Sequence, residues 1–280
     1  MIISRRLNFC RYKICRHIYS TYKEFSTKPN PKGTTDENEL QYFSKMADDW
    51  WNTKGPMQPL HDMNELRVPF IRDSLIDIGK TKKENSRTDH PLEGVNILEV
   101  GCGGGILTEA LARIGATMTG IDVASDLIKM ASTHANQDSK IKDRIKYTTE
   151  SIEVFSEKNP SSFDAVVCSE VIEHVTEKDL FVKSAVQALK PGGSIFITTI
   201  EKSLSAWVTA IVFAEYLLNI IPRGTHEYDK LISPHEMQRI LETNNCSTRL
   251  IQGWFYNPVT RKWAWSRATM FYALHAIKDA

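Results

Sequence analysis

Residues 95–122 read VNILEVGCGGGILTEALARIGATMTGID, which is a short apolar run, a glycine-rich turn, an amphipathic stretch and a second apolar run. Short apolar runs bounded by turn residues indicate buried strands, and the amphipathic stretch predicts a helix from Ile106 to Ile114. A strand, a helix and a second strand in this order form a right-handed crossover between parallel strands. The segment therefore predicts the first unit of an α/β sheet.

The same alternation continues toward the C-terminus. The further elements expected are a helix over 124–135, strands over 145–149 and 163–168, a helix over 178–189, a KPGG turn and a strand over 194–200. Strands that alternate with helices predict a doubly wound, parallel α/β sheet with helices on both faces. Such sheets bind ligands at the carboxyl ends of their strands, which are here Val100, Ile121 and Cys168.

Upstream of the sheet, residues 39–78 are predicted to form an N-terminal helical appendage. Apolar residues recur at helical spacing over 39–51, and a second helix is expected over 64–78, interrupted near Pro69. Residues 79–94 are rich in charge and show no periodicity, so we expect an exposed loop there.

The first 38 residues differ in composition from the rest of the chain. Residues 1–23 carry six arginines and lysines, no acid, and interleaved apolar and hydroxylated residues, which is the profile of a mitochondrial transit peptide. Residues 26–38 are polar and contain two prolines, as a linker does. We therefore expect a presequence and linker over 1–38 and one folded domain over 39–280. A disordered basic tail that binds anionic surfaces is the alternative.

Charge and cysteine content narrow the class of protein. The formal net charge is +1, and the mature chain shows no basic stripe interleaved with aromatic residues, so we expect no nucleic-acid binding. The five cysteines are odd in number and lack a CxxC spacing. This pattern argues against a disulfide framework and against structural zinc, and it suits a reducing compartment such as the mitochondrial matrix.

The glycine-rich turn points to a ligand site. A dinucleotide fingerprint, G-x-G-x-x-G, would need a third glycine where the chain has Ile106. The remaining pattern, E-x-G-x-G-x-G from Glu99 to Gly105, resembles the first motif of the Rossmann-like methyltransferases. Its glycines let the backbone approach an amino acid ligand, and Glu99 can meet the ligand's ammonium group. Asp122, at the end of the next strand, can accept hydrogen bonds from two ribose hydroxyls.

Each part of this pattern also has a purely structural interpretation. The glycines would then only form a tight turn, and Asp122 would only cap the helix that begins near Ala124.

A second cluster follows the fourth strand in CSEVIEHV, where Glu170, Glu173 and His174 are spaced i, i+3 and i+4. If this stretch is one helical turn, the three side chains share a face and can converge on one cation. Two carboxylates and an imidazole suit magnesium, manganese, iron or zinc. In the alternative, the glutamates complement the helix dipole and His174 is an ordinary, partly buried histidine.

Residues 203–222, SLSAWVTAIVFAEYLLNIIP, form a long apolar stretch after the fifth strand. Its few polar residues fall on one narrow helical stripe, which predicts a helix that lies in the membrane interface. The alternative is a buried helix that covers the core or a substrate pocket.

Together these motifs carry a family resemblance. The segment 95–122 with SEVIEHV, LKPGG and RGTHEYDKLISP, and with DDWWNTKGPMQPLHDMNELR upstream, closely resembles the ubiquinone-biosynthesis O-methyltransferases of mitochondria and bacteria from about residue 39 onward. The resemblance implies a class I methyltransferase sheet with an antiparallel last strand and a helical insertion after the fifth strand. It also implies S-adenosylmethionine as methyl donor and polyprenylated dihydroxybenzoate and demethylubiquinol as acceptors.

The resemblance also implies binding residues, a metal ion and a subcellular location. The S-adenosylmethionine contacts that it implies are Arg67, Gly101, Asp122 and Ser169, and the divalent metal ligands, for magnesium in the first instance, are Glu170, Glu173 and His174. His226 in RGTHEYD is a candidate second-site residue, and the alternative is a loop histidine with a structural role. We expect the matrix face of the inner mitochondrial membrane, with lipid and other ubiquinone-biosynthesis proteins as partners. The competing hypotheses are a methyltransferase for another small acceptor and a catalytically silent scaffold subunit.

Overall fold

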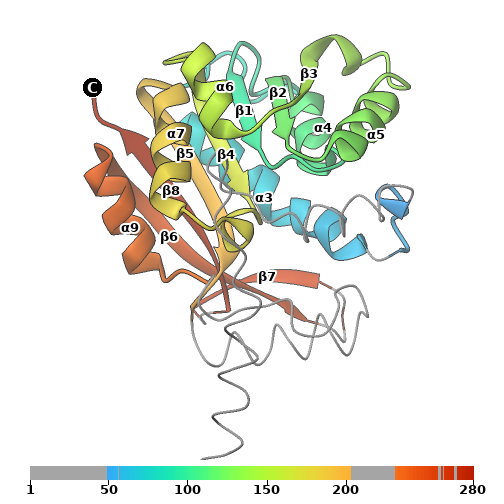
Figure 1. Cartoon of the computed structure of the whole chain (residues 1–280). Helices are drawn as coiled ribbons and strands as arrows, with labels where there is room; N and C mark the ends of the chain where they lie inside the picture. The colour runs from blue at the N-terminus through green and yellow to red at the C-terminus, as the bar shows by residue number, and fades with distance from the viewer. Residues whose placement is uncertain (1–48, 56, 203–230, 258–259, 261, 268–269) are drawn as a thin grey trace, which may run out of the picture. The chain divides into compact units, whose positions relative to one another are not determined.

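The computed structural model describes the chain except residues 1–48, 56, 203–230, 258–259, 261 and 268–269 (Figure 1). The described residues all belong to one compact unit, which spans Thr34–Ala280. Its centre is an eight-stranded sheet in the order β3-β2-β1-β4-β5-β8-β6-β7.

The first five strands of the chain form the parallel half of the sheet. They are β1 (Asn96–Val100), β2 (Thr117–Asp122), β3 (Ile145–Thr149), β4 (Phe163–Ser169) and β5 (Leu189–Ile200). Neighbours in the order β3-β2-β1-β4-β5 all pair in parallel. The winding direction reverses between β1 and β4, and an open α/β sheet leaves its ligand crevice at such a switch point. The predicted doubly wound sheet is confirmed.

The last three strands form the antiparallel half. They are β6 (Cys246–Asn257), β7 (Lys262–Ser266) and β8 (Phe271–Lys278). The final strand, β8, pairs antiparallel with β5, as the family resemblance implied. β6 then pairs antiparallel with β8 and with β7, which lies at the edge of the sheet.

Helices cover both faces of the sheet (Figure 1). On one face, α3 (Gln58–Asp77) and α4 (Ile106–Arg113) pack against Ile97, Val167 and Phe196. On the other, α6 (Ile152–Lys158), α7 (Lys178–Ala188) and α9 (Pro234–Thr243) pack against Leu98 and Ile195. The further helix α5 (Ser125–Ala135) packs against β2 and β3. Because both faces are covered, the inner strands are continuous apolar runs rather than alternating ones.

Some local predictions were wrong. The helix expected over 64–78 with a break near Pro69 is one continuous helix, α3, that begins at Gln58 and contains the proline. Proline costs a helix one hydrogen bond, and here the burial of Phe70, Ile71 and Leu75 after it offsets that loss. The KPGG segment, expected as a turn, lies within β5. α6 was not predicted, because its seven residues are too few to show a helical period.

Several predictions fall on parts of the chain outside the described residues. These are the presequence and linker, most of the helix expected over 39–51, the insertion over 203–222 and His226. The segment 79–94 is largely exposed and lacks helices and strands, as expected, although Leu92 is buried. Among the helices with described placement, none is long and apolar enough to cross a membrane.

Candidate cofactor site and carboxylate cluster

The carboxyl ends of three adjacent strands bring the predicted cofactor residues together. In the sheet register Val100 lies beside Ile121 on one side and beside Cys168 on the other. Gly101, Asp122 and Ser169 each follow or end one of these strands, so they lie side by side at the switch point. These three residues therefore lie at the edge of the sheet at which the sequence predicts a ligand site.

The loop from Gly101 to Gly105 needs glycine for two physical reasons. Gly101 and Gly105 have positive φ angles of 71° and 87°, a region that side chains with a Cβ rarely adopt. A Cβ at Gly101 would lie 2.6 Å from Cγ2 of Val171, and one at Gly104 would lie 2.4 Å from Cδ1 of Trp50. The loop is thus a tight turn, and its surface is also too close to its neighbours for any larger residue.

Asp122 ties this loop to the next helix. Its Oδ2 accepts a hydrogen bond from the Gly103 N–H and its Oδ1 accepts one from the Ala124 N–H, both at 2.9 Å. Burial raises the pKa of Asp122, while these backbone bonds oppose the rise. Asp122 thus bonds to the residue that precedes α5, but α5 has no side-chain cap, and the two backbone bonds use only part of the carboxylate. A carboxylate has about four acceptor positions, so further donors such as ribose hydroxyls can still bind.

Two buried groups of opposite charge lie near the glycine loop. Glu99, 4% exposed, is the last residue but one of β1 and accepts a hydrogen bond from the Thr108 hydroxyl, and burial raises its pKa to about 7. Arg67, also 4% exposed, comes from α3; burial lowers its pKa, against the charges of Glu99 and Glu170. A carboxylate and a guanidinium in this position match the ammonium and carboxylate groups of an amino acid ligand.

A chain of hydrogen bonds leads from Arg67 to the carboxylate cluster. Arg67 Nη1 donates to Ser169 Oγ at 2.9 Å, and Ser169 Oγ lies 2.8 Å from Thr198 Oγ1. Thr198 Oγ1 in turn lies 2.8 Å from Glu170 Oε1, to which it donates. The side chain of Ser169 thus lies between the amino acid end of the cofactor site and Glu170.

The carboxylate cluster does not have the predicted backbone. Glu170 has a positive φ of 55°, and only Ile172–His174 form a helix, of the 3-10 type. Glu170, Glu173 and His174 therefore do not share one α-helical face, because one left-handed residue redirects the chain and a 3-10 helix has three residues per turn. Across the described ranges, no group of three histidine, cysteine or acidic residues is placed so that it could hold a metal ion.

Glu170 and Glu173 are nevertheless close neighbours with defined partners. Burial, and next the charge of Glu173, raise the pKa of Glu170 to about 7. The hydroxyl of Thr199 donates to Glu173 Oε2 at 2.7 Å, so two successive threonines of β5 each hold one glutamate. Two acids that repel each other in a partly buried site are a suitable donor set for a divalent cation, which would offset the repulsion.

Sequence reasoning missed several residues of the site. Thr198 and Thr199 were assigned to a strand without a role, although their position at the carboxyl end of β5 marks them as candidates. The two tryptophans before α3 were considered only as apolar helix positions. Trp51 donates from Nε1 to the Gly104 carbonyl at 3.0 Å and stacks on His134 at a centroid distance of 3.6 Å. Both tryptophans support the glycine loop from outside.

Comparison with known proteins gives the same fold. Residues 98–197 match the family model described as a methyltransferase domain. Magnesium protoporphyrin IX methyltransferase from Synechocystis PCC 6803, solved with bound S-adenosylhomocysteine, is similar in fold, with a TM-score of 0.60 and 18% identity over 87% of this chain and 100% of that one.

Curated relatives are much more similar in sequence. The mitochondrial ubiquinone biosynthesis O-methyltransferase of Rattus norvegicus is 43% identical over 98% of this chain and 78% of the rat protein, and that of Homo sapiens is 42% identical over 98% and 73%. The ubiquinone biosynthesis O-methyltransferase of Chelativorans sp. (strain BNC1) is 39% identical over 85% of this chain and 92% of its own length.

The sheet order, the glycine loop after β1 and the acid after β2 define an S-adenosylmethionine-dependent methyltransferase of the α/β class. Within that class, identity near 40% over most of both chains is decisive. The chain belongs to the ubiquinone biosynthesis O-methyltransferase family.

Proposed function

We propose that the protein transfers the methyl group of S-adenosylmethionine to a phenolic oxygen of polyprenylated catechols, namely a prenylated dihydroxybenzoate and a demethylubiquinol. The observation that carries the cofactor part is the buried pair of opposite charges, Glu99 and Arg67, near a loop whose conformation requires glycine at Gly101 and Gly105. The acceptor class is supported by the names of the relatives, which act in ubiquinone biosynthesis.

In this proposal three side chains bind the cofactor. Glu99 accepts the ammonium group, Asp122 accepts the ribose hydroxyls, and Arg67 faces the carboxylate. Arg67 already donates from Nε to Asn64, from Nη1 to Ser169 and from Nη2 to Leu60 and Asn64. An arginine has five N–H donors, so one N–H remains for the cofactor carboxylate or for a bridging water. Arg67 is thereby held rigidly before the ligand arrives, which lowers the entropic cost of binding.

For the chemical step we propose that Glu170, Glu173 and His174 hold a divalent cation, with magnesium as the first candidate, and that these three side chains, which are not placed around one point in the free protein, converge when the cation binds. When bound, the cation supplies the Lewis acidity that lowers the pKa of a phenol from its ordinary value near 10. The chain's own contribution is positional, since Thr198 and Thr199 fix the two glutamates from the adjacent strand. The phenolate oxygen then attacks the methyl carbon in line with the departing sulfur, and S-adenosylhomocysteine leaves.

The test is a steady-state assay that measures S-adenosylhomocysteine formation with a short-chain prenylated 3,4-dihydroxybenzoate, with and without chelator. The proposal predicts turnover that chelator abolishes and added magnesium restores. Glu170→Gln should lose this metal response while S-adenosylhomocysteine binding stays within about twofold, because the glutamate does not touch the cofactor. Turnover that is indifferent to chelator would eliminate the metal, and no turnover with this catechol or with a short-chain demethylubiquinol would eliminate the acceptor class.

We also propose that the protein works in the mitochondrion, on the matrix face of the inner membrane, after loss of a presequence within residues 1–38. The rat and human relatives are named mitochondrial, and the acceptor's prenyl chain partitions into lipid. Residues 203–222, predicted as an interfacial helix, supply the membrane contact in this proposal. Liposome flotation of a variant with Trp207 and Phe213 changed to aspartate should show reduced binding, and undiminished flotation would exclude this helix as the membrane contact.

A further inference from the structure

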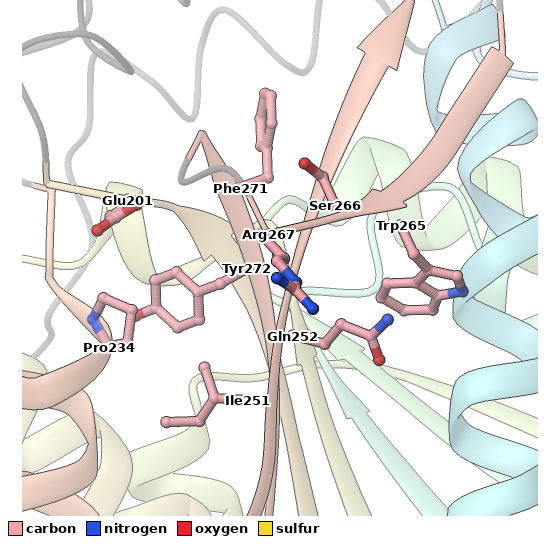
Figure 2. A pocket seen from close by; sticks show the side chains of 10 residues that line it. Glu201, Pro234, Ile251, Gln252, Trp265, Ser266, Arg267, Phe271 and Tyr272 are labelled. Carbon is pink, nitrogen blue, oxygen red and sulfur yellow. The ribbon is translucent and has the colours of Figure 1, made fainter.

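A pocket of about 570 Å³ lies in the antiparallel half of the sheet, outside the cofactor site (Figure 2). Its wall is built from the residue after β5, the middle of β6, the end of β7, the start of β8 and the first residue of α9. Its aromatic residues are Tyr272, Trp265 and Phe271. A volume of several hundred Å³ with mainly apolar walls and a few polar groups is typical of sites for small organic ligands. Of its lining residues, only Pro234 lies within a motif that the sequence analysis quotes, RGTHEYDKLISP.

One lining residue carries a positive charge that nothing in the described chain neutralises. Arg267 is exposed and lies directly after β7. No hydrogen bond or ion pair joins its guanidinium to any residue with described placement, and in Figure 2 it lies between Tyr272 on one side and Trp265 on the other. A planar guanidinium with free donors is suited to bidentate binding of a carboxylate.

A second lining residue has an unsatisfied polar group. Tyr272 is 2% exposed, and its hydroxyl has no hydrogen-bond partner among the residues that the structure describes. In Figure 2 the hydroxyl lies beside Pro234, which has no N–H to donate. Buried hydroxyls almost always have a partner, and one without a partner in the free protein is a candidate for a ligand contact.

The pocket adjoins the carboxylate cluster. In the register of β5 and β8, Tyr272 lies beside Thr199, whose hydroxyl donates to Glu173. Burial, followed by the charge of Glu173, raises the pKa of Tyr272, so the two groups are close enough to interact. A ring bound in the pocket would therefore lie next to the proposed reaction centre.

The positions of the two charged residues in the pocket would orient a bound ligand. Its acid, Glu201, follows β5, whereas Arg267 follows β7, three strand positions away. A ligand with a carboxylate at one end and hydroxyl groups at the other would place the carboxylate at Arg267. Its hydroxyls would then point toward Glu201 and β5, the strand that holds Glu170 and Glu173.

We infer that this pocket binds the aromatic ring of the acceptor and that Arg267 recognises a ring carboxylate, so that Arg267 distinguishes acidic from neutral catechols. The inference rests on the proposed function, because it assigns a site to one of the two acceptors. Tyr272 contributes the ring contact and a hydroxyl that finds its partner only in the ligand. A neutral quinol would bind the same walls without using the guanidinium.

The test measures binding without turnover. The full chain is saturated with S-adenosylhomocysteine, which has no methyl group to transfer, and titrated calorimetrically with two short-chain prenylated catechols. One carries a carboxylate, and the other carries a methyl group in its place. Arg267→Gln should weaken binding of the acidic catechol by about tenfold, which corresponds to one charge-assisted hydrogen bond, and should change the affinity for the neutral catechol by less than about twofold. Arg249→Gln, on exposed β6 surface outside the pocket, is the charge-matched control and should change neither.

Equal losses for both catechols, or no loss for the acid, would overturn the role of Arg267. Tyr272→Phe provides an independent measurement, since removing an unsatisfied hydroxyl should leave thermal stability unchanged or higher while the acid binds several-fold more weakly. A clear loss of stability with unchanged affinity would overturn the role of Tyr272. If the wild type binds the acid but does not methylate it, the proposed function fails while the pocket stands. If it methylates the acid and Arg267→Gln is silent, only the pocket fails.

Discussion

Replacing Asp122 with asparagine should weaken cofactor binding much more than the small change in side-chain size indicates. The carboxylate accepts bonds from the N–H groups of Gly103 and Ala124, one on each oxygen. An asparagine has only one oxygen, so its NH₂ group must face one of these two donors, and that N–H loses its partner. A buried donor without a partner costs about 1–3 kcal/mol of folding stability. The free energy of unfolding should fall by this amount even without cofactor.

The substitution also removes hydrogen bonds between the cofactor's ribose and the charged carboxylate. Ribose hydroxyls that donate to a charged carboxylate are worth roughly 1.5–3 kcal/mol each, so loss of the charge should raise the Kd of S-adenosylhomocysteine by about tenfold to a hundredfold. Isothermal titration measures this, with Asp126→Asn as control, because Asp126 is exposed in the first turn of α5 and removes the same charge. Wild-type affinity in Asp122→Asn would refute the assignment of the ribose site.

Three further results are expected. Between pH 4.5 and about 7 the folded, cofactor-free protein keeps the proton on Glu99, whereas the unfolded chain has released it. The free energy of unfolding therefore falls as the pH rises through this window. Glu99→Gln should make the free energy of unfolding, measured with urea, depend less on pH. Gly104→Ala should lower the Tm and the affinity for S-adenosylhomocysteine, because its Cβ would lie 2.4 Å from Trp50. Thr199→Val keeps the shape but removes the donor to Glu173, and it should weaken Mn²⁺ binding, measured by electron paramagnetic resonance, by about tenfold.

The parallel half of the fold could be predicted because its strands and turns are specified by short, contiguous stretches of sequence. Runs such as VNILEV and FDAVVC are mostly apolar, as is typical of strands covered on both faces, and the glycine-rich turn at Gly101–Gly105 separates a strand from a helix. The cofactor edge followed from the same pattern, because parallel strands end together. Gly101, Asp122 and Ser169 therefore lie where the sequence predicted.

The rest depends on contacts that are distant in the chain. Nothing in SEVIEHV indicates that Glu170 adopts a left-handed backbone conformation. In the structure its side chain accepts a hydrogen bond from Thr198, which lies on another strand. Pro69 suggested a break in α3, but burial of that helix against the sheet decided otherwise. The pocket of Arg267 and Tyr272 exists only because the end of β7, the middle of β6, the start of β8 and the residue after β5 come together across the antiparallel half of the sheet, and no spacing of residues foretells that.

The most direct test of the account uses S-adenosylmethionine with a ¹³C-labelled methyl group, the purified chain, magnesium and a short-chain prenylated 3,4-dihydroxybenzoate. Nuclear magnetic resonance of the product then shows which atom carries the label. The account predicts a labelled methoxy carbon on the catechol with the wild type and a strongly reduced signal with Asp122→Asn. A label on carbon or nitrogen, or no transfer by folded protein that binds the cofactor, would contradict it.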